Sequence, residues 1–88
     1  MKLLIHKESK IVVRIISDDD LVDLHSDRTQ IYGPQREIIL DLMSSNAEVV
    51  TTTVVQPDDW AANAYKINQV EGQDDTWVAN SDYVAPED

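Results

Sequence analysis

The chain has 88 residues and no cysteine, and 17 acidic residues against 7 basic ones give a net charge of −10. This length suits one small domain, and the missing cysteines exclude disulfides and thiolate metal sites. Leu, Ile and Val account for about a quarter of the residues, whereas disordered, highly charged chains stay below about 20% in Leu, Ile, Val and Phe. The composition therefore predicts a folded domain.

The charge is divided unevenly along the sequence. Residues 1–17 carry +3 and residues 18–88 carry −13. Binding to nucleic acid or to an acidic lipid surface needs several clustered cations, so we expect neither, whereas a basic protein partner is compatible with this charge. The first apolar run, at residues 3–5, is too short for a signal peptide, and no run reaches the about 18 apolar residues of a membrane span. We expect synthesis in the cytoplasm without a signal peptide.

The first half of the chain contains several short segments typical of β-strands. Residues 2–5 and 11–16 predict an N-terminal hairpin, and the continuous apolar run of the second segment predicts burial on both of its faces or against a partner. Residues 21–25 predict a short strand or a turn. Residues 29–32 predict another short strand, which ends at Gly33.

Two interpretations of residues 34–45 remain open. The apolar residues at spacings of three and four favour a helix: Ile38, Ile39, Leu42 and Met43. Residues 38–40 alone are equally compatible with a short strand.

The second half of the chain begins with the clearest strand signal. Residues 47–55 are almost entirely β-branched after Glu48, and Pro57 ends the run. Residues 60–64 are long enough for one helical turn. A C-terminal hairpin of residues 65–70 and 76–79 follows.

These segments define the fold class. We predict a mainly β protein, all-β or α+β, with antiparallel hairpins at both ends and room for one short helix. Residues 1–80 form a single domain, and residues 81–88 form an extended acidic tail.

One short pattern has metal-binding chemistry. Asp23, His25 and Asp27 lie at alternate positions, and on a strand they share one face, where two carboxylates and an imidazole are possible ligands for a divalent metal. A solvated acidic loop is the favoured alternative, because His6 is the only other histidine. The sequence lacks G-x-S-x-G, P-loop and G-x-G-x-x-G motifs. We therefore expect no enzyme, no catalytic residue, no cofactor and no metal.

The aromatic residues gather near the C-terminus. Tryptophan and tyrosine are enriched at protein interfaces, so a recognition surface is one hypothesis for Trp60, Tyr65, Trp77 and Tyr83. The alternative, favoured for the two tryptophans, is that they form the small core of the C-terminal hairpin, since the chain has no phenylalanine.

The acidic surface also has two interpretations. The favoured one is solubility and resistance to self-association. The other is mimicry of DNA phosphates, by which the chain acts as an inhibitor of a host nucleic-acid-binding protein.

The C-terminal third carries a resemblance. The run Pro57-Asp58-Asp59-Trp60, then Tyr65-Lys66-Ile67, Gly72, Trp77 and finally Asn80-Ser81-Asp82-Tyr83-Val84-x-Pro86-Glu87 resembles short proteins encoded among the tail and virion genes of tailed bacteriophages. About 30 residues match well, and the chain departs from the pattern at Ser81, where the pattern has proline.

This resemblance implies a context and no catalytic activity. It implies a non-enzymatic structural or interaction module in the virion, in a tail, baseplate or fibre attachment. The implied partners are proteins, either further copies of the chain in an oligomer or other virion proteins.

Overall fold

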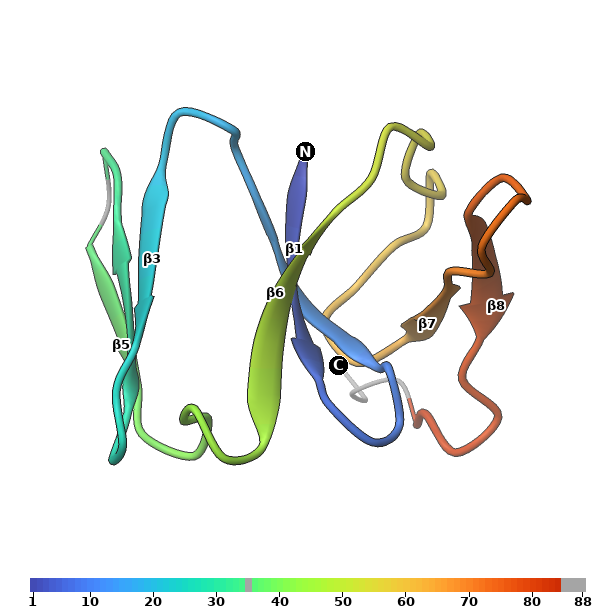
Figure 1. The fold of residues 1–88 in the computed structure, drawn as a ribbon. Coiled ribbons are helices and arrows are strands. Elements are labelled where there is room, and N and C mark those ends of the chain that lie inside the picture. Colours follow the sequence, from blue (N-terminus) through green and yellow to red (C-terminus); the bar gives the residue numbers. More distant parts are fainter. Residues whose placement is uncertain (35, 85–88) are drawn as a thin grey trace.

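The computed structural model describes residues 1–34 and 36–84, and within them it contains eight β-strands and no helix. Figure 1 shows the strands in three groups along the molecule. The strands are β1 (Lys2–His6), β2 (Val12–Ile16), β3 (Leu21–Leu24), β4 (Thr29–Tyr32), β5 (Glu37–Ile39), β6 (Ala47–Thr51), β7 (Tyr65–Asn68) and β8 (Thr76–Ala79). The mainly β prediction and the hairpins at both ends are confirmed. No described residue belongs to a helix capable of crossing a membrane.

All strand pairings within the three sheets are antiparallel. The central sheet has the order β2-β1-β6, a second sheet has the order β3-β4-β5, and β7 pairs with β8. In Figure 1 the β3-β4-β5 sheet lies on the left, the central sheet in the middle and the β7-β8 hairpin on the right.

Strand β1 is buried on both faces. Because side chains alternate across a strand, Leu4 points into one apolar cluster and Leu3 and Ile5 point into the other. The first cluster fills the space between the central sheet and the β3-β4-β5 sheet, and includes Ile31 and Ile39. The second cluster lies between the central sheet and the C-terminal hairpin. The three side chains of β1 are at most 1% exposed, so this strand is the centre of the fold.

A β-bulge lets β2 contribute to both clusters. The register moves from Leu4↔Arg14 to Ile5↔Val12, which leaves Val13 without a partner on β1. Such an extra residue changes the alternation of side chains. Val12 therefore joins the second cluster, while Val13 joins the first. Of the two alternatives predicted for this apolar run, the structure shows burial on both faces.

The C-terminal hairpin is attached to the outer edge of β2. Ile11 forms an antiparallel bridge with Lys66, and the N–H of Ile67 donates to the carbonyl of Lys10 at 3.1 Å. The N–H of Asn63 donates to the carbonyl of Val12 at 3.0 Å. These hydrogen bonds hold the hairpin over the second cluster, where Ile67 is buried.

The helical interpretation of residues 34–45 is wrong. Residues 37–39 form β5, which pairs with β4. Ile39 and Leu42 face the first cluster, whereas Ile38 is exposed, so the apolar residues do not lie on one helical face. The strand alternative of the sequence analysis is the correct one.

Two further boundaries differ from the prediction. Strand β6 ends at Thr51, four residues earlier than predicted. The backbone of Thr52 still exchanges hydrogen bonds with Met1 at 3.0 and 2.9 Å. Its Oγ1 donates to Asp75 at 2.7 Å and accepts from the N–H of Val54 at 3.2 Å, where the chain turns away. Residues 60–64 form turns instead of a helical turn, with the N–H of Ala64 donating to the carbonyl of Ala61. Of the predicted tail, residues 85–88 lie outside the described residues.

One ion pair joins the central sheet to the β3-β4-β5 sheet. Arg14 Nε and Nη2 donate to the two carboxylate oxygens of Glu37 at 3.0 and 2.9 Å. Arg14 Nη1 donates to the carbonyl of Val13 at 2.9 Å, which satisfies an acceptor at the bulge. The same guanidinium therefore stabilises the bulge and links two sheets.

We predict that Leu4→Ala lowers the free energy of unfolding by about 2–5 kcal/mol, because it opens a cavity at the centre of the first cluster. Urea unfolding followed by circular dichroism measures this change. Val55→Ala is the control, since Val55 is 82% exposed and should change stability by less than about 0.5 kcal/mol. Equal effects of the two substitutions would contradict the burial of Leu4.

We also predict a pH-dependent contribution from the Arg14–Glu37 pair. The hydrogen bond from Arg14 holds the pKa of Glu37 below its ordinary value of 4.5. A carboxyl with a lowered pKa in the folded state stabilises the fold above its unfolded pKa, and this stabilisation is lost as the pH falls through the folded pKa. Glu37→Gln should therefore cost up to about 1 kcal/mol at pH 7 in this solvent-exposed pair. The difference from the unmodified chain should shrink below pH 4.5, and a difference that stays constant from neutral to acidic pH would contradict it.

Candidate functional site

The three residues of the possible metal site do not assemble a metal centre. Asp23 lies on β3, and His25 follows this strand, where its Nε2 lies 3.0 Å from Gln30 Oε1. Asp27 accepts a hydrogen bond from Arg28 Nη1 at 2.7 Å. Across residues 1–34 and 36–84, no group of three His, Asp or Glu side chains is arranged to hold a metal ion.

Two of the four C-terminal aromatic residues, both tryptophans, contribute to the second apolar cluster. Trp60 and Trp77 are half-buried and pack against it. Tyr65 meets Trp77 edge to face, with ring centroids 6.3 Å apart. The hydroxyl of Tyr65 donates to Asp59 at 2.7 Å, and this hydrogen bond raises the pKa of Tyr65. Tyr83 is half-buried and follows a turn at Asn80. Much of the apolar surface of the tryptophans is thus used inside the chain.

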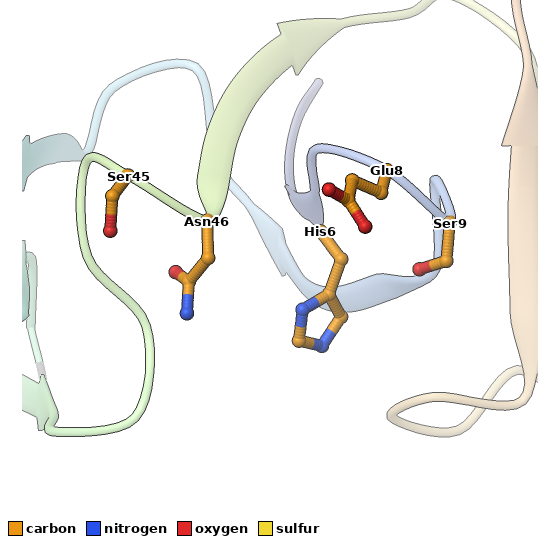
Figure 2. Close-up of a pocket in the computed structure, with 5 residues that line it drawn as sticks. All are labelled: His6, Glu8, Ser9, Ser45 and Asn46. Carbon is orange, nitrogen blue, oxygen red and sulfur yellow. The ribbon is translucent and has the colours of Figure 1, made fainter.

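A hollow of about 290 Å³ lies between the β1–β2 turn and the turn that precedes β6. Figure 2 shows the residues that line it, which are His6, Glu8, Ser9, Ser45 and Asn46. Histidine, serine and glutamate together have the chemistry of a nucleophile, a base and an orienting acid.

The hydrogen bonds of this hollow do not form such a triad. Ser9 Oγ accepts a hydrogen bond from the N–H of Ile11 at 3.3 Å, which is a turn contact. No hydrogen bond joins His6 to Ser9 or Glu8 in the described part of the chain. Ser9 Oγ is thus engaged with the backbone of its own turn.

The outer face of the β3-β4-β5 sheet is the strongest candidate for a functional surface. The inner face of this sheet packs on the first cluster through Ile31 and Ile39, with Val22 and Leu24 at its margin. By the alternation of strands, the opposite face carries the side chains between them. The register places Leu21 beside Tyr32, and Asp23, Gln30 and Ile38 in one row across the three strands.

Apolar side chains cross this outer face from β3 to the end of β5. We call Leu21, Tyr32, Ile38 and Leu40 the apolar stripe. Leu21 is 65% exposed, Ile38 is 57% exposed and Leu40, just after β5, is 73% exposed. Outward positions of an antiparallel sheet that faces water are usually polar, so exposed leucine and isoleucine depart from the usual pattern here.

A polar network fixes the middle of the outer face. Gln30 Oε1 accepts from the hydroxyl of Tyr32 at 2.9 Å and lies 3.0 Å from His25 Nε2. On the inner face of the same strand, the hydroxyl of buried Thr29 donates to the carbonyl of Leu42 at 2.9 Å, and this hydrogen bond anchors β4. These contacts position the side chains of Gln30 and Tyr32 on the outer face and anchor β4.

Carboxylates border the β3 side of the apolar stripe. Asp23 lies on the face itself, and Asp19 and Asp20 immediately precede β3. The carboxylate of Asp20 lies against Gly33, where an added Cβ would be only 2.6 Å from Asp20 Oδ2. Asp19 and Asp23 are exposed and form no ion pair within the described residues. Lys2 Nζ donates to the carbonyl of Asp20 at 2.7 Å, and the N-terminal amine lies 3.2 Å from Asp18 Oδ1. The unpaired negative charge at this edge is therefore that of Asp19 and Asp23.

The strand edges of the central sheet are covered at some of their backbone groups. At β6, the N–H of Ala47 donates to the carbonyl of Met43 at 2.9 Å, and Gln69 Nε2 donates to the carbonyl of Thr51 at 3.1 Å. At β2, the carbonyl of Val13 accepts from Arg14, and that of Val12 accepts from Asn63. Pairing with a further strand needs a row of free backbone groups, and these contacts interrupt such a row at both ends of β6 and along β2.

No family model matches this chain, and neither a curated protein nor a solved structure is significantly similar to it.

The sequence analysis missed the outer face. The sequence contains one sign of this face, which is the adjacent pair Ile38 and Ile39 in a three-residue strand. Adjacent side chains of a strand point to opposite faces, so one of the two isoleucines must point away from the core. Which isoleucine points outward depends on the pairing with β4, and this pairing is not readable from the residues alone.

We predict that Ile38→Thr and Ile39→Thr differ sharply in stability although they are neighbours. Ile38→Thr should change the free energy of unfolding by no more than about 0.5 kcal/mol, because its side chain is exposed. Ile39→Thr should cost about 2–4 kcal/mol, because it removes buried apolar surface and buries a hydroxyl. Chemical denaturation of both variants tests this, and a large loss from Ile38→Thr would show that it is a core residue.

Proposed function

We propose that this chain is a non-enzymatic structural or interaction module that acts through protein–protein contacts. The observation that carries the proposal is the apolar stripe, which lies exposed on a sheet whose other face is packed and whose centre is fixed by Gln30. Large apolar side chains on a preorganised face favour association because their burial removes them from water without a large loss of conformational freedom.

We further propose that the module belongs to the virion of a tailed bacteriophage, in a tail, baseplate or fibre attachment. This context is supported by the C-terminal pattern from Pro57 to Glu87. The small size and high acidity of the chain are compatible with it.

The proposal of a non-enzymatic role is supported by the hollow beside His6, where Ser9 Oγ accepts a hydrogen bond from the backbone N–H of Ile11. The alternative role as an acidic DNA mimic has less support. Several carboxylates bind groups of the chain itself, including Asp59 with Tyr65 and Asp75 with Thr52. Side chains engaged in this way are poorly placed to imitate a regular row of phosphates.

We predict that the chain is a stoichiometric component of phage particles. The test is quantitative mass spectrometry of particles of the encoding phage, purified on a density gradient and washed at about 1 M salt, where the Debye length falls to about 3 Å. A constant copy number per particle after the wash supports the virion proposal. Its absence from washed particles, with the chain recovered instead on a host nucleic-acid-binding protein, would overturn the proposal in favour of the mimic.

A further inference from the structure

We infer that the outer face of the β3-β4-β5 sheet binds a cationic, amphipathic segment of another protein. In this arrangement leucine-like side chains of the partner cover the apolar stripe, and its lysines or arginines lie along the acidic β3 edge. The inference rests on the proposed interaction function and adds to it the surface and the chemistry of the partner.

The apolar part of the inference follows from exposure and spacing. Leu21 and Ile38 lie on the two outer strands of the sheet, and Tyr32 lies between them on β4. A partner that spans the three strands covers all of these side chains at once. Leu21 and Ile38 are both more than half exposed, so a partner that covers them removes apolar surface from water, which favours binding.

The charge of the partner follows from the carboxylates at the stripe. Asp19 and Asp23 are exposed and have no ion-pair partner in residues 1–34 or 36–84. An acidic or neutral partner would place these carboxylates at the border of a desolvated contact without a counter-charge, which is unfavourable. A lysine or arginine opposite them removes this penalty and accelerates association.

The chain itself has few free cations with which to serve as that partner. Five of its seven cationic side chains are held by hydrogen bonds within the chain, namely Lys2, Lys7, Lys10, Arg14 and Arg28. Two copies would also bring together two net charges of −10. Self-repulsion therefore disfavours a second copy on this face and favours a basic protein.

The contact is made by side chains of the face more than by strand addition. Strand β5 has only three residues, which offers a short edge for backbone pairing. The network at Gln30 keeps Tyr32 in place, so the partner meets a preformed surface. Preorganisation of this kind reduces the entropic cost of binding.

The test is a titration of the full ¹⁵N-labelled chain with a synthetic peptide of alternating lysine and leucine, followed by NMR chemical shifts. Three comparisons make the test specific: a lysine–glycine peptide, a glutamate–leucine peptide, and chain variants. We expect shifts concentrated on β3, β4 and β5. The double variant Leu21→Thr/Ile38→Thr should weaken binding at least about tenfold, which corresponds to about 1.4 kcal/mol. Val78→Thr is the matched control, because Val78 is an outward residue of β8 that is 46% exposed.

Asp23→Asn tests the charge of the edge separately. It should weaken binding of the lysine–leucine peptide by a few fold and reduce the salt dependence of binding, because one carboxylate is removed. The spectra of all variants must keep the dispersion of the folded chain, which separates lost binding from lost folding.

Absence of binding of the lysine–leucine peptide would overturn the inference, and so would each of three other results. One is equal binding of the lysine–glycine and lysine–leucine peptides, which would mean non-specific charge attraction. Another is peptide binding that maps to the C-terminal hairpin instead of the β3-β4-β5 sheet. The third is concentration-dependent self-association that the double variant abolishes, because the occupant would then be a second copy. Presence in virions without peptide binding on this face would refute only this inference, whereas peptide binding without presence in virions would refute only the virion proposal.

Discussion

Burial of β1 on both faces is the constraint on which the rest of the structure depends. An 88-residue chain has little surface to bury, and domains of this size are stable by a narrow margin. Placing Leu4 in one cluster and Leu3 with Ile5 in the other lets a single strand support two apolar layers. The bulge at Val13 extends this arrangement to β2, because it sends neighbouring valines to opposite faces.

The same arrangement explains where the free surface lies. Both faces of the central sheet are packed against other parts of the chain. The tryptophans of the C-terminal segment pack against its second cluster. Only the inner face of the β3-β4-β5 sheet is packed against the rest of the chain. Its outer face keeps Leu21 and Ile38 exposed, with carboxylates beside them. A surface of this kind gives a small, rigid chain a place for a partner, which is why we assign the proposed interaction to this face.

Much of the fold could be predicted from local sequence patterns. The apolar run of residues 11–16 predicts two-sided burial, and the alternation of Tyr65 and Ile67 predicts the C-terminal hairpin, because both signals are carried by neighbouring residues. The bulge at Val13, the outward direction of Ile38 and the early end of β6 depend on pairings and hydrogen bonds between distant residues. The candidate surface is a consequence of such pairings, so its residues appear in the sequence only as ordinary leucine and isoleucine.

Native-state hydrogen exchange measured by NMR tests most directly the claim that β1 is the centre of the fold. The amides of Leu3, Leu4 and Ile5 should exchange only through global unfolding, with the largest protection in the chain, because opening them disrupts both clusters. The amides of β5 and β8, at the outside of the molecule, should exchange through smaller local openings. Protection of β1 no greater than that of β5 or β8 would contradict the account, since the two clusters would then not share a central strand.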